Sequence, residues 1–452
     1  MGTPNVDTIF ALASGAGRAG IAVYRISGPG AGAAFTALTG RALPEPRHAV
    51  RIRVGKDVSG DIIDDGIGLW FTAPESFTGE DVAELHLHGG PAVMAAVTEA
   101  LGAIDGLRLA EPGEFSRRAF ENGKFDLTQA EGLADLVNAE TESQRRQARR
   151  QFDGALTAVF EDWRTRLIAA LAGAEAAIDF IDEDDVPADL MATMNHKISG
   201  IIDEITQYLD DDHRGERLRD GIYIAILGAP NVGKSSLLNV LARRQAAIVS
   251  EIAGTTRDVI EVHLNMGGVP VIVADTAGLG EAGDEIEGEG IRRARARAAD
   301  ADVKLALFDA QSWPRMDDAT SSLVDGDTVV VVNKADLCDP SRGSLGPLSH
   351  EDRPVQVISV LRGDGMADLV HRIETEVTGR IETAGPPALT RARHRAALED
   401  CAQALKRCQA ADAAELVAED LRLAARALGR ITGRIDVEDV LDAIFKEFCI
   451  GK

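Results

Sequence analysis

Aromatic residues and cysteine are scarce in this chain of 452 residues. Phe, Trp and Tyr together make up 4% of it, and its four cysteines include no CxxC pair: Cys338, Cys401, Cys408 and Cys449. This spacing supports neither a zinc site nor a disulfide framework, and it best fits a reduced, cytoplasmic compartment. Cys401 and Cys408 are spaced to share one face of a helix, where we expect core residues rather than metal ligands.

Long apolar runs are also missing. The longest stretches, such as 167–174, are ended by a charged residue, so the sequence predicts no membrane span. The start of the chain lacks the profile of a signal peptide, and Val6 stands where a myristoylation signal needs Ser or Thr.

Basic charge is in short supply as well. The chain has 48 Lys and Arg against 73 Asp and Glu, a net charge of −25. A strongly acidic protein has no general affinity for nucleic acid, because phosphate contacts need a basic surface. RNA bound through a local patch or through a partner stays possible. Glu140–Arg150, with Arg145, Arg146, Arg149 and Arg150, is either a solvated helix face or such a phosphate-contacting strip.

The length predicts about three domains. Residues 1–118 look α/β, with strands at 7–13, 21–27, 49–54, 66–71 and 82–88 and a helix at 91–104. Residues 119–214 and 379–452 look helical, and Thr128-Gln-Ala-Glu131 predicts a capping box. Helices on both sides of 215–378 indicate one helical domain interrupted by an insertion, with tandem domains as the alternative.

The middle segment alternates apolar strands with helices, as in a doubly wound parallel sheet. We expect its strands at 222–227, 259–264, 269–274, 303–308, 328–332 and 355–359. The motif from Gly228 to Ser235, Gly-Ala-Pro-Asn-Val-Gly-Lys-Ser, lies between the first strand and a helix, which predicts a phosphate-binding loop. Lys234 would reach the β- and γ-phosphates, and the Ser235 hydroxyl would bind Mg²⁺.

Three further motifs come in the order of a GTPase. Gly254-Thr-Thr-Arg-Asp258 offers Thr256 as a second Mg²⁺ ligand, and Asp275-Thr-Ala-Gly278 offers Asp275 and the Gly278 N–H. Asn333-Lys-Ala-Asp336 provides a carboxylate for guanine, and Ser359-Val-Leu361 completes the base pocket. The predicted GTP-binding residues are Asn231, Val232, Gly233, Lys234, Ser235, Ser236, Ser250, Glu251, Ile252, Ala253, Gly254, Thr255, Thr256, Asp275, Thr276, Ala277, Gly278, Asn333, Lys334, Ala335, Asp336, Ser359, Val360 and Leu361.

The hydrolytic machinery departs from that of Ras-like GTPases. Leu279 stands where those proteins place the glutamine that orients the attacking water. Carboxylates in the next loop, at Asp284, Glu285 and Glu287, are the available replacements. No arginine finger is evident, and a monovalent cation with Asn231 as a side-chain ligand would supply the missing positive charge.

Outside this segment, two polar clusters stand at 77–90 and 111–120. With Tyr24-Arg-Ile-Ser-Gly28, the run 126–131, the GTPase motifs and the ending Phe448-Cys-Ile-Gly-Lys452, they resemble the MnmE (TrmE) family, GTPases of tRNA wobble-uridine modification. The GTPase motifs alone would fit several translation-linked families, whereas the amino-terminal clusters and the ending are more specific. The resemblance covers nearly the whole chain, and Gly280 departs from it where a basic residue is expected.

The resemblance implies a fold, ligands and partners. It implies an amino-terminal folate-binding-like α+β domain (1–118) that forms a homodimer, a helical domain in two parts (119–214 and 379–452), and an inserted Ras-like GTPase domain (215–378). A 5-formyl- or methylene-tetrahydrofolate would bind Arg25, Glu84, Lys124 and Lys452, with 450–452 packed back onto the folate domain. K⁺ would bind Asn231, Ser250, Ile252 and Thr255, and Glu287 would position the water. Cys449 would serve the modification step, or be merely a packed thiol.

The expected function is therefore K⁺-activated GTP hydrolysis with the flavoprotein MnmG (GidA), in a heterotetramer or larger complex. It would install aminomethyl or carboxymethylaminomethyl groups at C5 of U34 in certain tRNAs. The alternatives are a ribosome-assembly GTPase and a nucleotide-gated scaffold without modification chemistry of its own.

Overall fold

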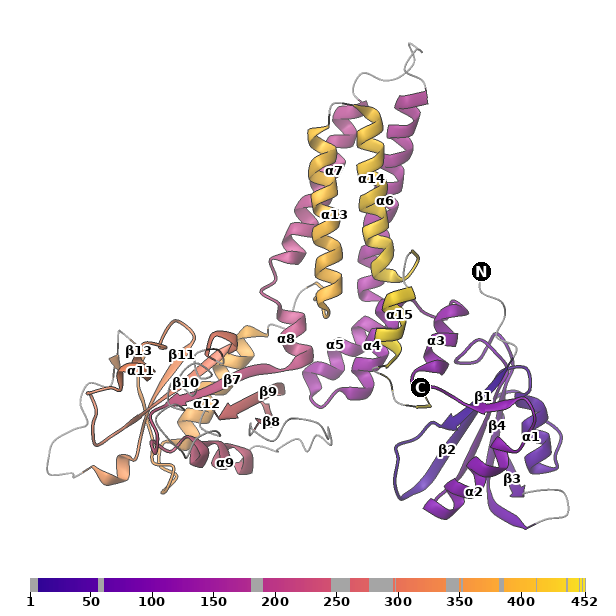
Figure 1. Cartoon of the computed structure of the whole chain (residues 1–452), viewed down its shortest axis with the longest axis horizontal. Helices are drawn as coiled ribbons and strands as arrows, with labels where there is room; N and C mark the ends of the chain where they lie inside the picture. Colours follow the sequence, from indigo (N-terminus) through magenta and orange to yellow (C-terminus); the bar gives the residue numbers. More distant parts are fainter. Residues whose placement is uncertain are drawn as a thin grey trace, which may run out of the picture. The chain divides into compact units, whose positions relative to one another are not determined.

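The computed structural model describes residues 7–55, 61–179, 190–244, 261–275, 296, 298–338, 349–350, 353–381, 386–411, 413–435, 438–446, 448 and 450–451. The chain divides into two compact units. Their helices and strands are labelled in Figure 1. Unit 1 comprises Met1–Ala134, Gln151–Ala188 and Ala410–Lys452, and unit 2 comprises Asp135–Arg150 and Asp189–Gln409. The boundaries expected at 118/119, 214/215 and 378/379 stay predictions.

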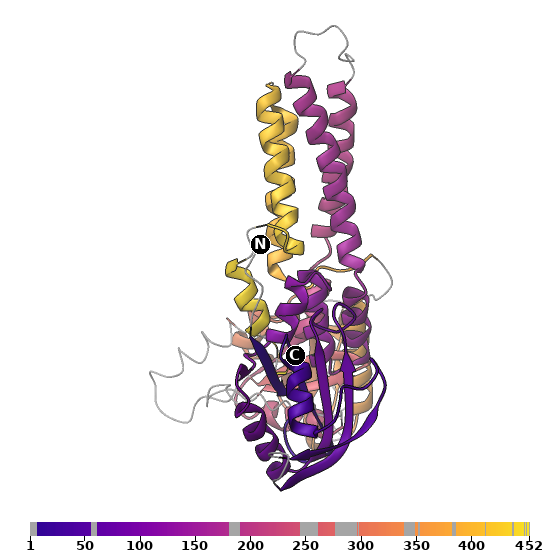
Figure 2. The same ribbon diagram turned by 90° about the vertical axis from the view of Figure 1, so that its right-hand side faces the viewer.

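Unit 1 begins with a six-stranded sheet, the indigo and violet layer at the bottom of Figure 2. Its order is β3 (Val50–Gly55), β4 (Ile62–Phe71), β5 (Val82–Gly89), β2 (Ala19–Ser27), β1 (Thr8–Leu12) and β6 (Leu107–Leu109). Neighbours are antiparallel except β1 and β6. Leu85 and Leu87 share a core with side chains of α1 (Ala31–Thr39) and α2 (Pro91–Gly102). Because successive strand residues face opposite ways, Glu84 and His86 lie on the other face.

The remaining helices of unit 1 are α3 (Glu114–Glu121), α4 (Leu127–Asn138, whose residues from Asp135 on fall in unit 2), α6 (Ala155–Asp179), α14 (Ala414–Thr432) and α15 (Glu438–Lys446). Ion pairs join α14 to α6 through Arg422 and Glu175, 2.8 Å apart, and Arg434 just after α14 contacts Glu161 at the same distance. Phe445 and Phe448 pack with Leu127 and Ala130 of α4, so the end of the chain is held against the start of α4.

The capping box of α4 lies two residues before the predicted one. Asp126 accepts a hydrogen bond from the Gln129 N–H (2.9 Å), and the Gln129 side chain accepts one from the Asp126 N–H (3.1 Å). Thr128 instead lies buried inside the first turn. Asp caps a helix as well as Thr does, so either register was chemically available.

Unit 2 is built around a second six-stranded sheet. Its order is β14 (Gln356–Val357), β11 (Thr328–Asn333), β10 (Val303–Asp309), β7 (Ile222–Gly228), β9 (Val269–Asp275) and β8 (Glu261–Met266). The central strands are buried on both faces. One face packs against α9 (Lys234–Arg244) and α12 (Met366–Arg380), and the alternate residues belong to two further clusters. Burial on both faces explains why these strands are apolar almost throughout.

The remaining elements of unit 2 are largely helical: α5 (Glu142–Phe152, of which the last two residues fall in unit 1), α7 (Leu190–Leu209), α8 (Arg214–Asp220), α11 (Asp318–Ser321), the 3₁₀ turn η1 (Ala335–Leu337) and α13 (Ala392–Ala410, whose last residue falls in unit 1). A short hairpin joins β12 (Ser349–His350) to β13 (Arg353–Pro354). Cys401 and Cys408 are buried in α13, as expected of core residues. Among the described residues, no helix has the length and apolar content needed to cross a bilayer.

The expected doubly wound sheet is parallel except at one edge. β8 runs antiparallel to β9, because the turn at Gly267 and Gly268 joins them as a hairpin. Both glycines have positive φ, which suits a tight turn. The last expected strand, 355–359, is reduced to the two residues of β14.

Lys304 is a charged residue within the otherwise apolar start of the interior strand β10, and its charge has a partner. It stands at the start of the strand, 8% exposed, and its ammonium pairs with Asp325. Burial alone would raise the pKa of Asp325, but hydrogen bonds from Lys304, Thr328 and the Asp327 N–H more than offset it and lower that pKa. The pair therefore allows a charged residue at the edge of the core.

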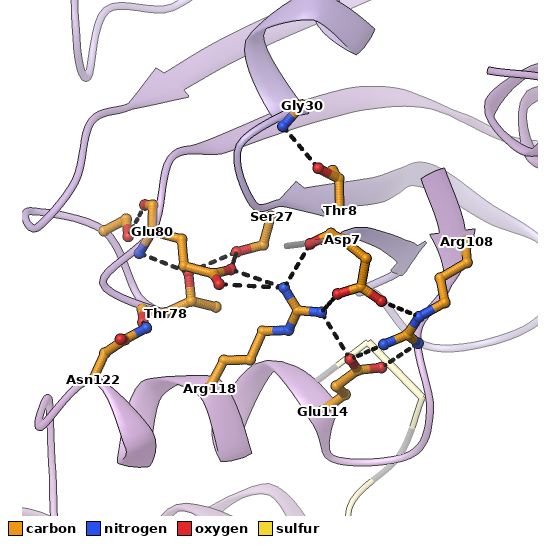
Figure 3. A network of polar contacts seen from close by, with 11 residues as sticks. Asp7, Thr8, Ser27, Gly30, Thr78, Glu80, Arg108, Glu114, Arg118 and Asn122 are labelled. Carbon is orange, nitrogen blue, oxygen red and sulfur yellow. Dashed lines mark hydrogen bonds and ion pairs between the residues drawn. The ribbon is translucent and has the colours of Figure 1, made fainter. Parts of the chain in front are cut away.

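A buried ion network ties the first strand of unit 1 to α3 (Figure 3). Arg118 is 1% exposed and contacts Asp7 (2.8 Å), Glu80 (3.2 Å) and Glu114 (2.9 Å). Arg108 joins Glu114 from β6. Burial alone would raise the pKa of Glu114, but hydrogen bonds from Arg108, the Glu111 N–H and Arg118 lower it. The network holds the loop that carries Glu80 against α3.

We predict that this network stabilises unit 1 fully only above about pH 4 and loses its effect progressively at lower pH. A carboxylate whose folded pKa lies below its unfolded value, about 4.3 for Glu, stabilises the fold above that value and loses the effect as pH falls through the folded pKa. Glu114→Gln should destabilise unit 1 by about 2 kcal/mol at pH 7 and flatten this pH dependence. Hydrogen exchange at the amides of β1 and α3 measures it, and exposed Glu111→Gln is the matched control. Equal exchange in both variants would contradict the role of Glu114.

Candidate functional site

The carboxyl ends of β7, β9, β10 and β11 meet at one edge of the unit 2 sheet. The pairing places Ile226 opposite Asp275, Leu307 opposite Gly228, and Asp309 opposite Asn333. Three of the predicted motifs therefore start side by side.

The loop between β7 and α9 has the backbone that its glycines allow. Gly228 has φ +152° and Gly233 φ +106°, and Asn231 adopts φ +63° although it is not glycine. A Cβ on Gly233 would lie 2.4 Å from the Asn333 amide nitrogen, and one on Gly228 would lie 2.7 Å from the Leu307 carbonyl oxygen. The loop thus packs tightly against the neighbouring strand ends, with its residues 231 and 235 exposed.

Lys234 is drawn into this loop. Its ammonium donates to the carbonyls of Gly228 (2.7 Å) and Ala229 (3.0 Å), and the residue is 6% exposed. Burial lowers the pKa of Lys234, and the charges of Asp275 and Asp317 offset this only in part. The Ser235 hydroxyl donates to the carboxylate of Asp275, which is 1% exposed. A hydroxyl and a carboxylate side by side are hard oxygen donors, the set that Mg²⁺ prefers.

Asn333 fastens the phosphate loop to the predicted base pocket. Its amide nitrogen donates to the Val232 carbonyl (2.8 Å), and its amide oxygen accepts from the Val360 N–H (3.1 Å). Asp336 accepts from the Ser359 hydroxyl (2.5 Å), which leaves its second carboxylate oxygen for a ligand. Leu361 is 85% exposed beside it. A carboxylate fixed in this way can accept from the N1–H and exocyclic amine of guanine.

The sequence analysis missed one residue of this edge. Asp309, the last residue of β10, pairs with Lys334 at 2.8 Å. Burial alone would raise the pKa of Asp309, but hydrogen bonds from Lys334 and the Gln311 N–H lower it. Lys334 has φ +65°, so its backbone turns sharply after the strand. Asp309 could have been identified from the sequence because it is the last residue of a predicted strand, as Asn333 is of the next strand.

Many predicted site residues lie outside the described residues. They are Ser250, Glu251, Ile252, Ala253, Gly254, Thr255, Thr256, Thr276, Ala277, Gly278, Glu287, Cys449 and Lys452. The carboxylates Asp284 and Glu285, Leu279 and Gly280 lie outside them too. Their predicted roles stay predictions.

Unit 1 contains the second predicted site. Arg25 of β2 stands opposite Glu84 of β5, and their side chains form an ion pair at 2.9 Å. The guanidinium lies 5.2 Å from the ring centre of Phe77 and 5.8 Å from that of Phe115. His86, two residues along the same strand face, contacts Glu84 at 3.3 Å. The sequence analysis did not assign His86, although its period-2 spacing from Glu84 was visible.

Lys124 and its neighbour Phe125 both contact the loop that carries Phe77. Phe125 packs on Phe77, with ring centres 6.1 Å apart, and Lys124 donates to the Pro74 carbonyl (2.7 Å) in the same loop as Phe77. The structure therefore brings Arg25 and Glu84 into contact and ties Lys124 to the loop that carries Phe77.

The end of the chain returns to this sheet. Ile450 forms a β-bridge with Pro112, and the backbone of Gly451 packs on Leu12, so that a Cβ there would lie 2.1 Å from the Leu12 carbonyl oxygen. Leu12 is next to Ala11, which pairs with Arg25. The expected packing of the last residues onto the amino-terminal domain is seen for Ile450 and Gly451.

Comparison with known proteins covers both units. The family model described as the MnmE helical domain matches residues 127–449, and the model described as the N-terminus of the GTP-binding protein TrmE matches residues 8–124. The chain belongs to the MnmE family. The resemblance stated from the motifs, and with it the multidomain fold, is thereby confirmed.

Relatives in this family match over their full length. A "tRNA modification GTPase MnmE" of Paramagnetospirillum magneticum is 58% identical over 446 residues, 99% of this chain and 100% of that protein. A protein of the same name from Rhodospirillum rubrum is 55% identical over 459 residues, again 99% and 100%. A structure of Era from Aquifex aeolicus is 28% identical over 40% of this chain and 66% of that chain, at a TM-score of 0.28, too low to support an argument.

We predict that Asp336 sets base preference in this MnmE-family site. Asp336→Asn should weaken GTP binding on the order of a hundredfold, because two hydrogen bonds to a charged acceptor are lost. It should improve binding of xanthosine triphosphate, whose 2-carbonyl can accept from the new amide. Titration with fluorescent analogues of both nucleotides measures this, and Leu337→Ala, an exposed neighbour, is the control. An unchanged preference would show that Asp336 does not read the base.

Proposed function

We propose that this chain is a GTP hydrolase that acts in tRNA modification. The observation that carries the proposal is the single edge where Lys234, the Ser235–Asp275 pair and the Asn333–Asp336 turn meet, in a chain 58% identical to a tRNA modification GTPase. Loop amides and a lysine suit a phosphate chain, and the turn suits guanine.

Nucleotide binding requires two local exchanges. Lys234 now donates to loop carbonyls, and it would move its donors to the β- and γ-phosphates. Ser235 now donates to Asp275, and its oxygen would turn to Mg²⁺, with Thr256 as a second hydroxyl ligand and Asp275 alongside. The metal would neutralise charge that develops on the phosphates. Asn333 would hold the base turn and the phosphate loop in a fixed relation.

Hydrolysis would depend on a cation and a carboxylate. Asn231 is exposed at the rim of the loop, and we propose it as a K⁺ ligand with Ser250, Ile252 and Thr255. K⁺ would supply the positive charge that an arginine finger supplies elsewhere. Glu287 would position the attacking water in place of the glutamine that Leu279 replaces.

The second site would bind the one-carbon donor. Arg25 and Glu84 offer a guanidinium and a carboxylate next to aromatic rings, which suits a polar pteridine, and Lys124 and Lys452 suit an anionic glutamate tail. The packing of Gly451 on Leu12 supports the reach of Lys452. The ligand would be 5-formyl- or methylene-tetrahydrofolate.

The remaining parts of the proposal concern partners. The protein would form a homodimer through its amino-terminal domain and act with the flavoprotein MnmG (GidA), in a heterotetramer or larger complex. Together they would install aminomethyl or carboxymethylaminomethyl groups at C5 of U34 in certain tRNAs. Cys449, three residues from the end, would serve that modification step rather than GTP hydrolysis.

We predict that turnover is specific for K⁺. Replacing K⁺ by Na⁺ should lower GTP turnover on the order of a hundredfold, the usual cost of losing one electrostatic stabiliser. Glu287→Ala in K⁺ should keep GTP affinity while hydrolysis is lost. Phosphate release at matched ionic strength measures both, with Glu285→Ala as the control. Equal rates in Na⁺ would exclude a specific role for K⁺ in hydrolysis. Continued hydrolysis by Glu287→Ala would show that a residue other than Glu287 positions the attacking water.

The function itself is tested in cells. A strain without this gene should lose the U34 modification in nucleoside mass spectrometry of its tRNA, and the wild-type gene should restore it. A Lys234→Ala gene should not, because the phosphate chain would lose its lysine. If the nucleosides of the deletion strain are normal and ribosomal particles change instead, the protein is a ribosome-assembly GTPase. If Cys449→Ser and Lys452→Ala both leave modification intact, it is a scaffold.

A further inference from the structure

Helix α5 of unit 2 carries an exposed basic surface that the nucleotide and folate sites do not use. We propose that this surface, the arginine face formed by Arg145, Arg146, Arg149 and Arg150, binds the phosphate backbone of the RNA substrate. The proposal rests on the proposed function, since it takes RNA to be that substrate.

The first support is local charge. The eight residues from Gln144 to Gln151 contain four arginines and no carboxylate, in a chain whose net charge is −25. All four arginines are exposed, and the side chains of Arg145 and Arg146 are 54% and 67% accessible. Guanidinium groups bind phosphate in a bidentate manner, so this is the side chain that phosphate recognition favours.

The second support is geometry. Residues four apart lie in one row on a helix, about 6 Å apart along its axis. Arg145 and Arg149 form one row, and Arg146 and Arg150 form the adjacent one. Ala148 is 2% exposed and holds the opposite side of the helix inside the fold. The four arginines therefore form a compact two-by-two array on the exposed side of the helix.

A carboxylate borders the arginine face at the first turn of the helix. Glu142 accepts hydrogen bonds from both Arg145 (2.8 Å) and Arg146 (2.7 Å). The hydrogen bonds from these two arginines lower the pKa of Glu142 to about 2. One negative charge shared by two exposed cations leaves that pair with a net positive charge, which water screens but does not cancel.

A second row of arginines shows what distinguishes this surface. Arg422, Arg426 and Arg430 also recur every four residues on α14 and are exposed. Arg422, however, pairs with Glu175 (2.8 Å) and Glu419 (3.3 Å), and Asp420 lies between Glu419 and Arg422 in the sequence. The α14 arginines thus form a single row of three, whereas the arginine face of α5 has four in two adjacent rows. In both helices the pairing carboxylate of the helix itself lies at the amino-terminal end of the arginine stretch.

The attachment of α5 gives the arginine face a route to the nucleotide site. The Ser143 N–H donates to the Gly268 carbonyl (3.4 Å) in the turn that opens β9, the strand that ends at Asp275. The Gln144 side chain donates to the Arg219 carbonyl (2.9 Å) near the end of α8, which leads into β7 and the phosphate loop. RNA held on α5 would therefore be connected through these hydrogen bonds to β7, which leads into the phosphate loop, and to β9, which ends at Asp275.

The test compares matched variants of the full chain. The variant with Arg145, Arg146, Arg149 and Arg150 all changed to Gln is compared with the same four positions changed to Lys and with R426Q/R430Q on α14. R149Q/R150Q is a milder version that leaves the two contacts of Glu142 intact. The probe is a fluorescently labelled, unmodified tRNA transcript, titrated at several salt concentrations. Basal GTP turnover without RNA reports on the fold of each variant.

We expect the four-Gln variant to bind tRNA at least about tenfold more weakly. The slope of its log K against log [salt] should fall by about 4, since each of the four lost phosphate contacts removes nearly one unit. The four-Lys variant should keep the salt slope of the wild type but bind more weakly than it does, because lysine keeps the charge and loses the bidentate contact. The α14 variant should bind like the wild type, and basal GTP turnover should not change in any of them. R149Q/R150Q, which removes two of the four arginines, should show about half of this decrease in slope.

Three results would overturn the proposal. One is equal affinity and slope in the four-Gln and wild-type proteins. Another is a four-Gln variant that keeps tRNA but no longer binds an acidic protein partner, which would make the arginine face a protein contact. The third is a wild-type chain that hydrolyses GTP but binds no tRNA. Absence of GTP turnover in the wild type would instead refute the proposed function, so the two failures are distinguishable.

Discussion

The register in which β7 pairs with β9 and β10 is the constraint on which the nucleotide site depends. It sets Ile226 beside Asp275 and Leu307 beside Gly228, so the phosphate loop and the Asp275 carboxylate emerge at the same level. Because side chains alternate along a strand, a slip of one residue would turn Asp275 to the other face of the sheet. Burial of both faces of the central strands makes such a slip costly, since it would exchange packed aliphatic side chains throughout the core.

In unit 1, strand register positions Arg25 and Glu84, and ion pairs and hydrogen bonds position the loop beside them. The antiparallel pairing of β2 and β5 sets Arg25 opposite Glu84, and this needs no other support. The loop that brings Phe77 over Arg25 has no strand to hold it, and hydrogen bonds fix it instead. Arg118 holds Glu80, and Asn122 donates to the Thr78 carbonyl at 2.8 Å. Burying an arginine costs desolvation, and the three ion pairs of Arg118 with Asp7, Glu80 and Glu114 offset that cost.

Features set by local pattern could be predicted from the sequence, and features set by distant contacts could not. Strand runs and the phosphate loop were predictable, because alternation, glycine spacing and apolar runs lie within a few residues of one another. The pairing of Lys304 with Asp325 and of Asp309 with Lys334 was not, because each joins residues more than 20 positions apart. The capping box was misplaced by two residues because Asp126 and Thr128 are both good caps. The direction of β8 depended on the two glycines of one turn, which the repeating strand–helix pattern concealed.

The acidity of the chain and the proposed use of RNA are compatible once distance is considered. At about 0.1 M salt the field of an exposed charge is screened within about 10 Å, so carboxylates elsewhere on the surface hardly repel a phosphate that sits on α5. The arginine face on α5 spans about one helical turn, which is within that distance, and its four guanidinium groups act together. Net charge then governs how often RNA encounters the protein, and the local arginines govern where it is held. The net charge of −25 argues against general affinity for RNA, so binding depends on exposed arginine clusters such as the arginine face.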